Sequence, residues 1–166
     1  MFERLNTPQQ AFNFELGAAL KTERAMLEML DKLSNTARDE KLKQLFRRHH
    51  HETQQQIAHL ERVFEMFGWE VEESPAPVAD ALDKDAKGTI KKMGKSLVPS
   101  GILQAALKSE HHEIAVYENL TVGAEALGKS DAAALLRENL AQERHTLEEV
   151  EEMLREVAAT MADEAA

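Results

Sequence analysis

Apolar residues recur along most of this chain at intervals of three and four positions, the spacing of one face of an α-helix. Four long segments carry such a stripe, and turn signals separate them. The pattern predicts four amphipathic helices, over residues 8–34, 37–67, 100–127 and 130–161. Few prolines, glycines and aromatic residues argue against a fold built from β-strands.

Capping residues mark the expected helix ends. Thr7, Pro8 and Gln10 form a capping-box pattern at the start of the first helix. Thr36 is a candidate cap for the second helix. Gly68 follows the last periodic residue of the second helix, as a C-terminal glycine does.

Residues 68–99 link the second and third long helices and are too many for a tight turn between antiparallel neighbours. Within them we expect two short helices, near Val78–Lys87 and Ile90–Lys95. A link of this length can travel the length of a bundle. We therefore predict an all-α, single-domain, ferritin-like four-helix bundle over residues 1–166, in which the second and third long helices run parallel.

A carboxylate interrupts each of the four apolar stripes near its middle. These residues are Glu23, Glu52, Glu113 and Glu143. The first two lie at similar distances on either side of Thr36, and the last two are equidistant from Gly128. Each pair should therefore meet at mid-bundle within roughly one helical turn.

Two interpretations of these acids are open. They could lie on solvated faces, if the stripes are drawn too generously. If all four are buried, they need protons or cations, because uncompensated buried carboxylates are costly. Two divalent ions would balance four carboxylates, and oxygen-rich ligation suits iron or manganese.

Neighbours on the second helix extend the candidate site. Gln56 lies one turn after Glu52, and its amide oxygen is a weak ligand for a hard metal ion. His49 lies three residues before Glu52 on the same face. We interpret His49 as a hydrogen-bonded residue that shields the site, with metal ligation as the alternative.

The third long helix adds two more candidates. Glu110 lies one turn before Glu113, and it either ligates metal or holds a histidine in place. Tyr117 lies one turn after Glu113 and is either a core aromatic residue or a hydrogen-bond donor to a metal-bound carboxylate.

Charge and composition exclude several classes of protein. The formal net charge is −10 without a large basic cluster, which disfavours a nucleic-acid partner. The absence of cysteine excludes disulfides, thiolate metal sites and thiol catalysis. Neither an apolar signal core nor a membrane-spanning stretch is evident, so we expect a cytoplasmic protein with no membrane partner.

Three segments, "FELGAALKTERAMLEML", "HHHETQQQIAHLERVFE" and "EHHEIAVYENL", resemble the YciE/YciF family of ferritin-like stress proteins. The resemblance extends over about residues 12–157 and implies a homodimeric bundle with a two-metal centre, without a settled activity. Aromatic residues are candidates for the dimer interface, with core packing as the alternative: Phe12, Phe64, Phe67 and Trp69.

The resemblance also implies the metal positions. They fall on Glu23, Glu52, Gln56, Glu110, Glu113 and Glu143. The chain departs from the expected pattern at three places. Gln55 and Thr146 stand where ferritin-like sites carry histidine, and Leu147 stands where the family is expected to carry an acid. One of the two metal ions should therefore bind more weakly than the other.

The function predicted from these features is a stress-type protein with a non-haem dimetal centre that handles iron, oxygen or peroxide. Two iron ions per chain are expected, with manganese as the other candidate metal. The alternative is a helical stress or interaction protein whose metal site is structural or vacant. Whether the chain is an enzyme, and what its electron donor is, stay open at this level.

Overall fold

The structure is a computed structural model that describes residues 4–165, so residues 1–3 and 166 of the predicted domain lie outside it. Four long helices make the bundle, and a shorter fifth helix lies in the crossover. Their bounds are α1 Pro8–Thr36, α2 Glu40–Phe67, α3 Pro77–Ile90, α4 Val98–Ala126 and α5 Ser130–Ala165.

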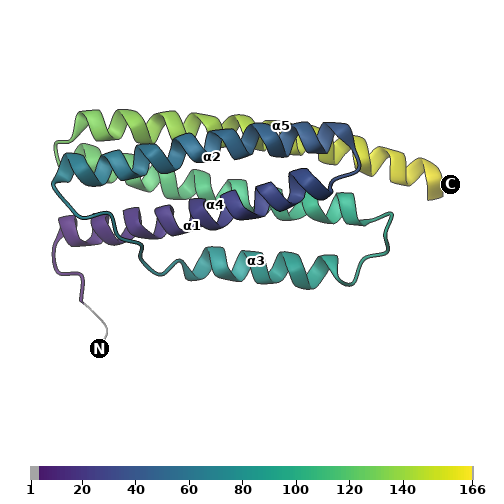
Figure 1. Ribbon diagram of the computed structural model, residues 1–166, viewed down its shortest axis with the longest axis horizontal. Helices are drawn as coiled ribbons and strands as arrows, with labels where there is room; N and C mark the ends of the chain where they lie inside the picture. Colours follow the sequence, from purple (N-terminus) through teal and green to yellow (C-terminus); the bar gives the residue numbers. More distant parts are fainter. Residues whose placement is uncertain (1–3, 166) are drawn as a thin grey trace.

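The four long helices form two antiparallel hairpins, α1–α2 and α4–α5 (Figure 1). The crossover carries the chain back along the whole bundle, so α2 and α4 run in the same direction. Close contacts join α1 to α2, α2 to α5, α5 to α4 and α4 to α1. Each long helix therefore has two antiparallel neighbours, and the predicted all-α crossover bundle is confirmed.

The first helix begins as its sequence predicts. The Thr7 hydroxyl accepts a hydrogen bond from the Gln10 backbone N–H, and the Gln10 side chain accepts one from the Thr7 N–H. The second helix differs from the prediction, because Thr36 still belongs to α1. Asp39 caps α2 instead, since its carboxylate accepts from the Leu42 N–H at 3.0 Å.

The crossover contains one helix, α3, where two were expected. The predicted helix near residues 90–95 does not form, and this stretch makes isolated turns such as Met93 N–H to Ile90 O at 3.1 Å. Gly94 lies within this stretch, and glycine is a poor helix former. Met93 and Ile90 pack instead against Gly101 of α4, where a Cβ would lie 2.4 Å from the Met93 sulfur.

The first part of the crossover lies against α1 at Gly17. A Cβ at this position would come within 2.7 Å of the Glu72 carbonyl oxygen and 2.9 Å of the Ser74 amide nitrogen. Both atoms belong to the backbone, so they cannot turn aside as a side chain can. Glycine is therefore required for the crossover to pass this close to α1.

Two apolar clusters fill the bundle, one toward each end. The first includes Leu16, Leu60 and Leu136, and the second includes Leu30 and Leu103, all at most 3% exposed. On every long helix a buried polar stretch separates the residues of one cluster from those of the other. The core is thus divided by a polar layer at mid-bundle.

The candidate interface aromatics mostly belong to the first apolar cluster. Phe12 is 5% exposed and Phe64 is fully buried within the single chain, so for these two residues the structure shows core packing, the second of the two alternatives. Phe67 stacks on Trp69 at 4.4 Å between ring centroids and contacts Phe12 at 5.0 Å. The homodimer and the cytoplasmic location stay predictions. Among the described residues, every helix is too short or too polar to cross a membrane.

Candidate metal centre

The polar layer at mid-bundle consists of buried ionisable and amide side chains from all four long helices. Among them are Glu23 from α1, His49 and Gln56 from α2, Glu110 and Glu113 from α4, and Glu143 from α5. None of these six is more than 4% exposed. Their positions follow from the helical repeat, which places each of them on the same face as the apolar residues one or two turns away.

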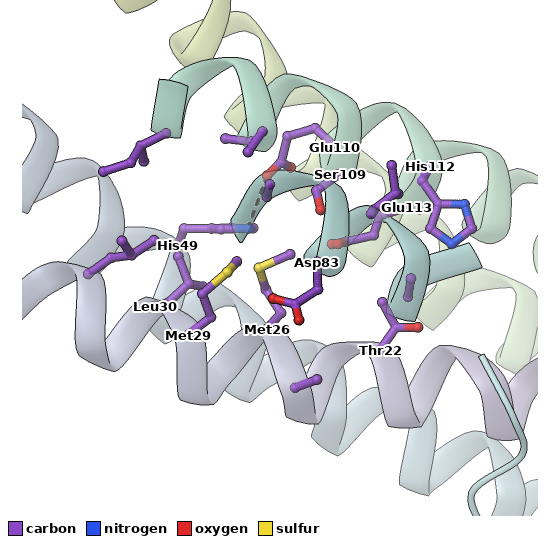
Figure 2. A pocket seen from close by; sticks show the side chains of 18 of the residues that line it. Thr22, Met26, Met29, Leu30, His49, Asp83, Ser109, Glu110, His112 and Glu113 are labelled. Atoms are coloured by element: carbon purple, nitrogen blue, oxygen red, sulfur yellow. Dashed lines mark ion pairs between the residues drawn. The ribbon is translucent and has the colours of Figure 1, made fainter. Parts of the chain in front are cut away.

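Four of these residues converge on one point. His49, Glu110, Glu113 and Glu143 each offer a ligand atom, and the four atoms lie within 4.8 Å of one another. The His49 Nε2 atom lies 3.3 Å from Glu110 Oε1 (Figure 2). The structure therefore gathers three of the predicted acids around His49, which the sequence had suggested as a shielding residue.

Four carboxylate oxygens in this group have no hydrogen-bond partner. Both oxygens of Glu113 and the Oε2 atoms of Glu110 and Glu143 are buried without such a partner, and the contact recorded for the His49 Nε2 atom is its ion pair with Glu110. Buried polar atoms are normally paired, because leaving them without a partner costs free energy. Carboxylate oxygens with one imidazole nitrogen form a donor set for iron or manganese, so the residues present fit a metal ion.

The pKa values of the layer also indicate that its buried charges need a compensating cation. Burial, and then the neighbouring charges of Glu23 and Glu110, raise the pKa of Glu113 well above its usual value. Burial raises the pKa of Glu143 in the same direction, with Glu113 as the next cause. Burial alone would lower the pKa of His49, but the charge and hydrogen bond of Glu110, with smaller effects of Glu52 and Glu113, together outweigh it and the pKa is raised. Without a cation, the layer therefore tends to hold protons.

Glu23 lies beside the four-residue group without belonging to it. Its Oε1 atom accepts a hydrogen bond from the Tyr117 hydroxyl at 2.5 Å, and its Oε2 atom has no partner. Burial raises its pKa to about 7, although the Tyr117 hydrogen bond acts in the opposite direction. The charge of Glu23 in turn raises the pKa values of Glu113 and Glu143. Tyr117 is thus a buried core residue that also donates a hydrogen bond to a carboxylate of the layer.

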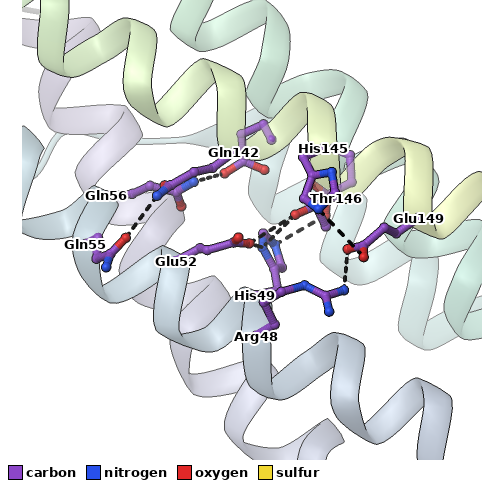
Figure 3. Close-up of polar contacts among 11 residues, drawn as sticks. Arg48, His49, Glu52, Gln55, Gln56, Gln142, His145, Thr146 and Glu149 are labelled. Carbon is purple, nitrogen blue, oxygen red and sulfur yellow. Dashed lines mark hydrogen bonds and ion pairs between the residues drawn. The ribbon is translucent and has the colours of Figure 1, made fainter.

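Glu52 lies at the edge of the layer, on the seam between α2 and α5 (Figure 3). Its side chain is 16% exposed, and its Oε2 atom accepts a hydrogen bond from Thr146 at 3.3 Å. Burial would raise the pKa of Glu52, but His49 and Thr146 together lower it. Glu52 therefore lies outside the four-residue group and closer to solvent, although its Oε2 atom is 3.9 Å from His49 Nδ1.

Gln56 contacts the group through one acid. Its side-chain N–H donates to Glu143 Oε1, while its own Oε1 atom has no partner. Asn139, which the sequence analysis missed, is fully buried, and its side chain donates to the Gln56 carbonyl at 3.3 Å. Asn139 lies one turn before Glu143, so the helical repeat alone could have identified it.

Three residues depart from the ligand pattern expected for ferritin-like sites, and the structure places each of them outside the four-residue group. Gln55 is exposed and accepts a hydrogen bond from Gln142 at 2.9 Å, outside the polar layer. Thr146 is 2% exposed and faces Glu52 and His49, so a hydroxyl occupies the place expected for a ligating histidine. Leu147 is only partly buried.

A four-helix bundle with a long crossover and a central cluster of buried carboxylates, here from α1, α4 and α5 with a histidine from α2, is typical of the ferritin-like class. The chain belongs to the family described as a domain of unknown function (DUF892), whose model matches residues 7–163. It is 32% identical over 144 residues to Protein YciF of Escherichia coli K12, a match that covers 86% of this chain and 87% of YciF. The resemblance to the YciF family is therefore confirmed.

Solved structures agree with this assignment. The crystal structure of YciF, an E. coli stress protein, matches 93% of this chain and 99% of its own with a TM-score of 0.85 at 27% identity. YcfI of Rhodopseudomonas palustris, described as a candidate structural protein, matches 91% of this chain and 98% of its own with a TM-score of 0.85 at 29% identity. A Xanthomonas campestris protein, 21% identical over 95% of this chain and 97% of its own, shares the fold with a TM-score of 0.75.

Proposed function

We propose that this chain is a stress-type protein that binds iron at a two-metal centre and takes part in handling iron, oxygen or peroxide. One observation carries the proposal. His49, Glu110, Glu113 and Glu143 bring ligand atoms within 4.8 Å of one another at the centre of the bundle, and four of their carboxylate oxygens lack a hydrogen-bond partner. The kinship with the E. coli stress protein YciF supports the stress-related part.

The residues divide into two ligand groups. His49, Glu110, Glu113 and Glu143 would hold the first ion. Glu23, whose charge acts on Glu113 and Glu143, would hold a second ion together with them. The four buried carboxylates carry four negative charges, which two divalent ions balance. Iron in such a site supplies electron exchange with dioxygen or peroxide.

Several neighbours orient these ligands and exclude water. Tyr117 holds Glu23, and Gln56 holds Glu143, each by a hydrogen bond. The two apolar clusters close the layer from both ends of the bundle. Glu52 is the partly exposed acid beside the group, so it offers ions from solvent a first carboxylate on the α2–α5 seam.

The metal content of the purified protein tests the proposal. Protein prepared without chelator, or metal-free protein given ferrous ion without oxygen, should hold about two ions per chain, with one bound more weakly. Glu110→Gln, which removes one buried charge of the group, should lower the content. Glu118→Gln, an exposed position on the same helix, is the control and should leave the content unchanged. Wild-type protein that takes up neither iron nor manganese would refute the proposal.

The second candidate is a helical structural protein whose polar layer holds protons instead of metal. The raised pKa values of Glu113 and Glu143 favour it, because neutral carboxyl groups can remain buried without cations. The description of the Rhodopseudomonas palustris relative points the same way. This candidate predicts that added iron or manganese leaves the urea midpoint of the metal-free protein unchanged, whereas a bound ion would raise the midpoint.

A further inference from the structure

A cavity of about 310 Å³ lies between the crossover helix α3 and the bundle. Residues of α1, α3 and α4 form most of its lining, and its inner end reaches His49, Glu110 and Glu113. Figure 2 looks into this space and places the thioether groups of Met26 and Met29 opposite the two carboxylates. The cavity thus extends from the crossover to the candidate metal centre.

The walls of the cavity are largely apolar. Aliphatic, thioether and aromatic groups from every contributing helix face it, among them Met26, Met29, Leu30, Phe46, Leu82 and Ile90. Such walls give water few hydrogen-bond partners, and apolar cavities of about 150 Å³ hold benzene. By this scale the cavity has room for roughly twelve carbon atoms.

Charged residues in the outer part of the cavity are already paired. Lys21 contacts Asp80 at 2.9 Å, and Lys87 contacts Asp83 at 2.6 Å. A charged head group that entered here would find no unpaired opposite charge among these four, and it would lose its hydration on moving further in between the apolar walls. The outer cavity therefore favours an uncharged molecule.

The helix that covers the cavity is held mainly at its edges. No residue of α3 is fully buried, and no side chain caps its start. Ion pairs on the surface join it to the bundle, Lys21–Asp80 toward α1 and Lys108–Asp85 toward α4. Exposed ion pairs contribute little to stability, so α3 can separate from the bundle more easily than the long helices can.

We infer that the cavity is a binding site for a neutral aliphatic molecule of about ten carbon atoms, which lies beneath α3 with one end beside His49, Glu110 and Glu113. The volume and the apolar walls of the cavity indicate a ligand with a hydrocarbon chain of this length. The paired charges in the outer cavity indicate that the ligand is uncharged. The site is built by the chain alone and does not depend on metal at the centre. Failure of the proposed iron binding would therefore leave this inference standing.

Calorimetric titration of metal-free protein with 1-decanol tests the site, and Ala86→Trp is the informative variant. Ala86 lines the cavity from α3, so the indole should fill the space and weaken binding about tenfold or more. Ala81→Trp is the matched control, because Ala81 lies on the same helix but is exposed and outside the lining. Its affinity should equal that of the wild type.

Three results of the titration would overturn the inference. The first is the absence of saturable binding of 1-decanol to the wild type. The second is equal affinity of wild type and a folded Ala86→Trp protein. The third is tighter binding of decanoate or decylamine than of 1-decanol, which would contradict a neutral ligand.

Methyl spectra of the wild type locate the ligand without any variant. With methionine methyl groups labelled by ¹³C, 1-decanol should shift the signals of Met26 and Met29, which line the cavity. Met66, which packs against the apolar cluster at the other end of the bundle, is the internal control and should not shift. Equal shifts at all three methionines, or a shift at Met66 alone, would place the ligand elsewhere and overturn the inference.

Discussion

Tyr117 on α4 donates a hydrogen bond of 2.5 Å across the bundle to Glu23 on α1. Both side chains are at most 1% exposed, so water cannot replace the phenol as donor. The bond fixes one oxygen of Glu23 and leaves the other, Oε2, without a partner. A buried acid held in this way is oriented for a cation before the cation arrives.

Replacing this donor should weaken metal binding without removing a ligand. Tyr117→Phe keeps the ring in the core but leaves both Glu23 oxygens unpaired. Loss of a residue that orients a ligand typically weakens metal affinity by about tenfold or more. Titration of metal-free variant and wild type with manganese measures the change. Equal affinities would mean that the hydrogen bond has no part in metal binding.

Leucine in place of Glu113 or Glu143 should abolish tight metal binding and stabilise the metal-free chain. Each change replaces a buried acid with unpaired oxygen by apolar volume. We expect the free energy of unfolding of metal-free protein to rise by about 2 kcal/mol, as when buried charges are replaced by apolar groups. Urea midpoints, measured beside iron and manganese content, test both effects.

The control for these variants is Glu148→Leu, at an exposed position on α5. It should change stability by less than about 0.5 kcal/mol and leave metal content unchanged. Unchanged metal content in both Glu113→Leu and Glu143→Leu would contradict the proposed site.

The stability of the metal-free protein should fall as the pH rises from 5 to 8. Burial raises the folded-state pKa of Glu23 from 4.5 to about 7, so between these values the folded chain binds more protons than the unfolded chain. A shift of this size contributes of the order of 3 kcal/mol, which is present below pH 4.5 and lost as the pH rises through 7. The raised pKa values of Glu113, Glu143 and His49 act in the same direction.

Urea midpoints of metal-free protein at pH 5 and pH 8 measure this dependence. Saturating metal should reduce it, because bound cations take the place of the protons. A midpoint that stays level over this range would mean that the acids are solvated in the folded chain, and a rising midpoint would equally contradict the prediction.

Gly17→Ala should destabilise the chain where the crossover passes α1. The added methyl group would meet the backbone of Glu72 and Ser74 at less than 3 Å, and overpacking of this kind typically costs about 1–3 kcal/mol. Gly88→Ala is the matched control, because a Cβ at Gly88 of α3 meets nothing within 4 Å. The control should be neutral or stabilising by up to about 1 kcal/mol. Equal effects of both substitutions on the urea midpoint would contradict the close approach at Gly17.

The sequence was sufficient for the long helices and for the depth of the acids. Periodicity over some thirty residues defines a helix face, and Glu23, Glu113 and Glu143 are all buried where that face predicts. Periodicity could not decide between His49 and Glu52. Residues three apart share a face, and only the rotation of α2 against its neighbours places His49 inward and Glu52 at the α5 seam.

The crossover was harder to predict for a related reason. Short helices there depend on what they pack against, and the sequence does not reveal that Met93 and Ile90 lie over Gly101 instead of continuing a helix. The cavity beneath α3 could not be predicted from the sequence at all. Its lining comes from residues 21–150, brought together only by the path of the crossover.

The polar layer also fixes the register of the four long helices. Apolar clusters alone tolerate a shift of one helix along another, since leucine can exchange for leucine. Here a shift by one turn, about 5.4 Å, would push Glu23 or Glu143 into an apolar cluster and leave its carboxylate among hydrocarbon groups. The buried acids therefore make every shifted packing of the four helices less stable than the observed one, whether or not a metal ion is bound.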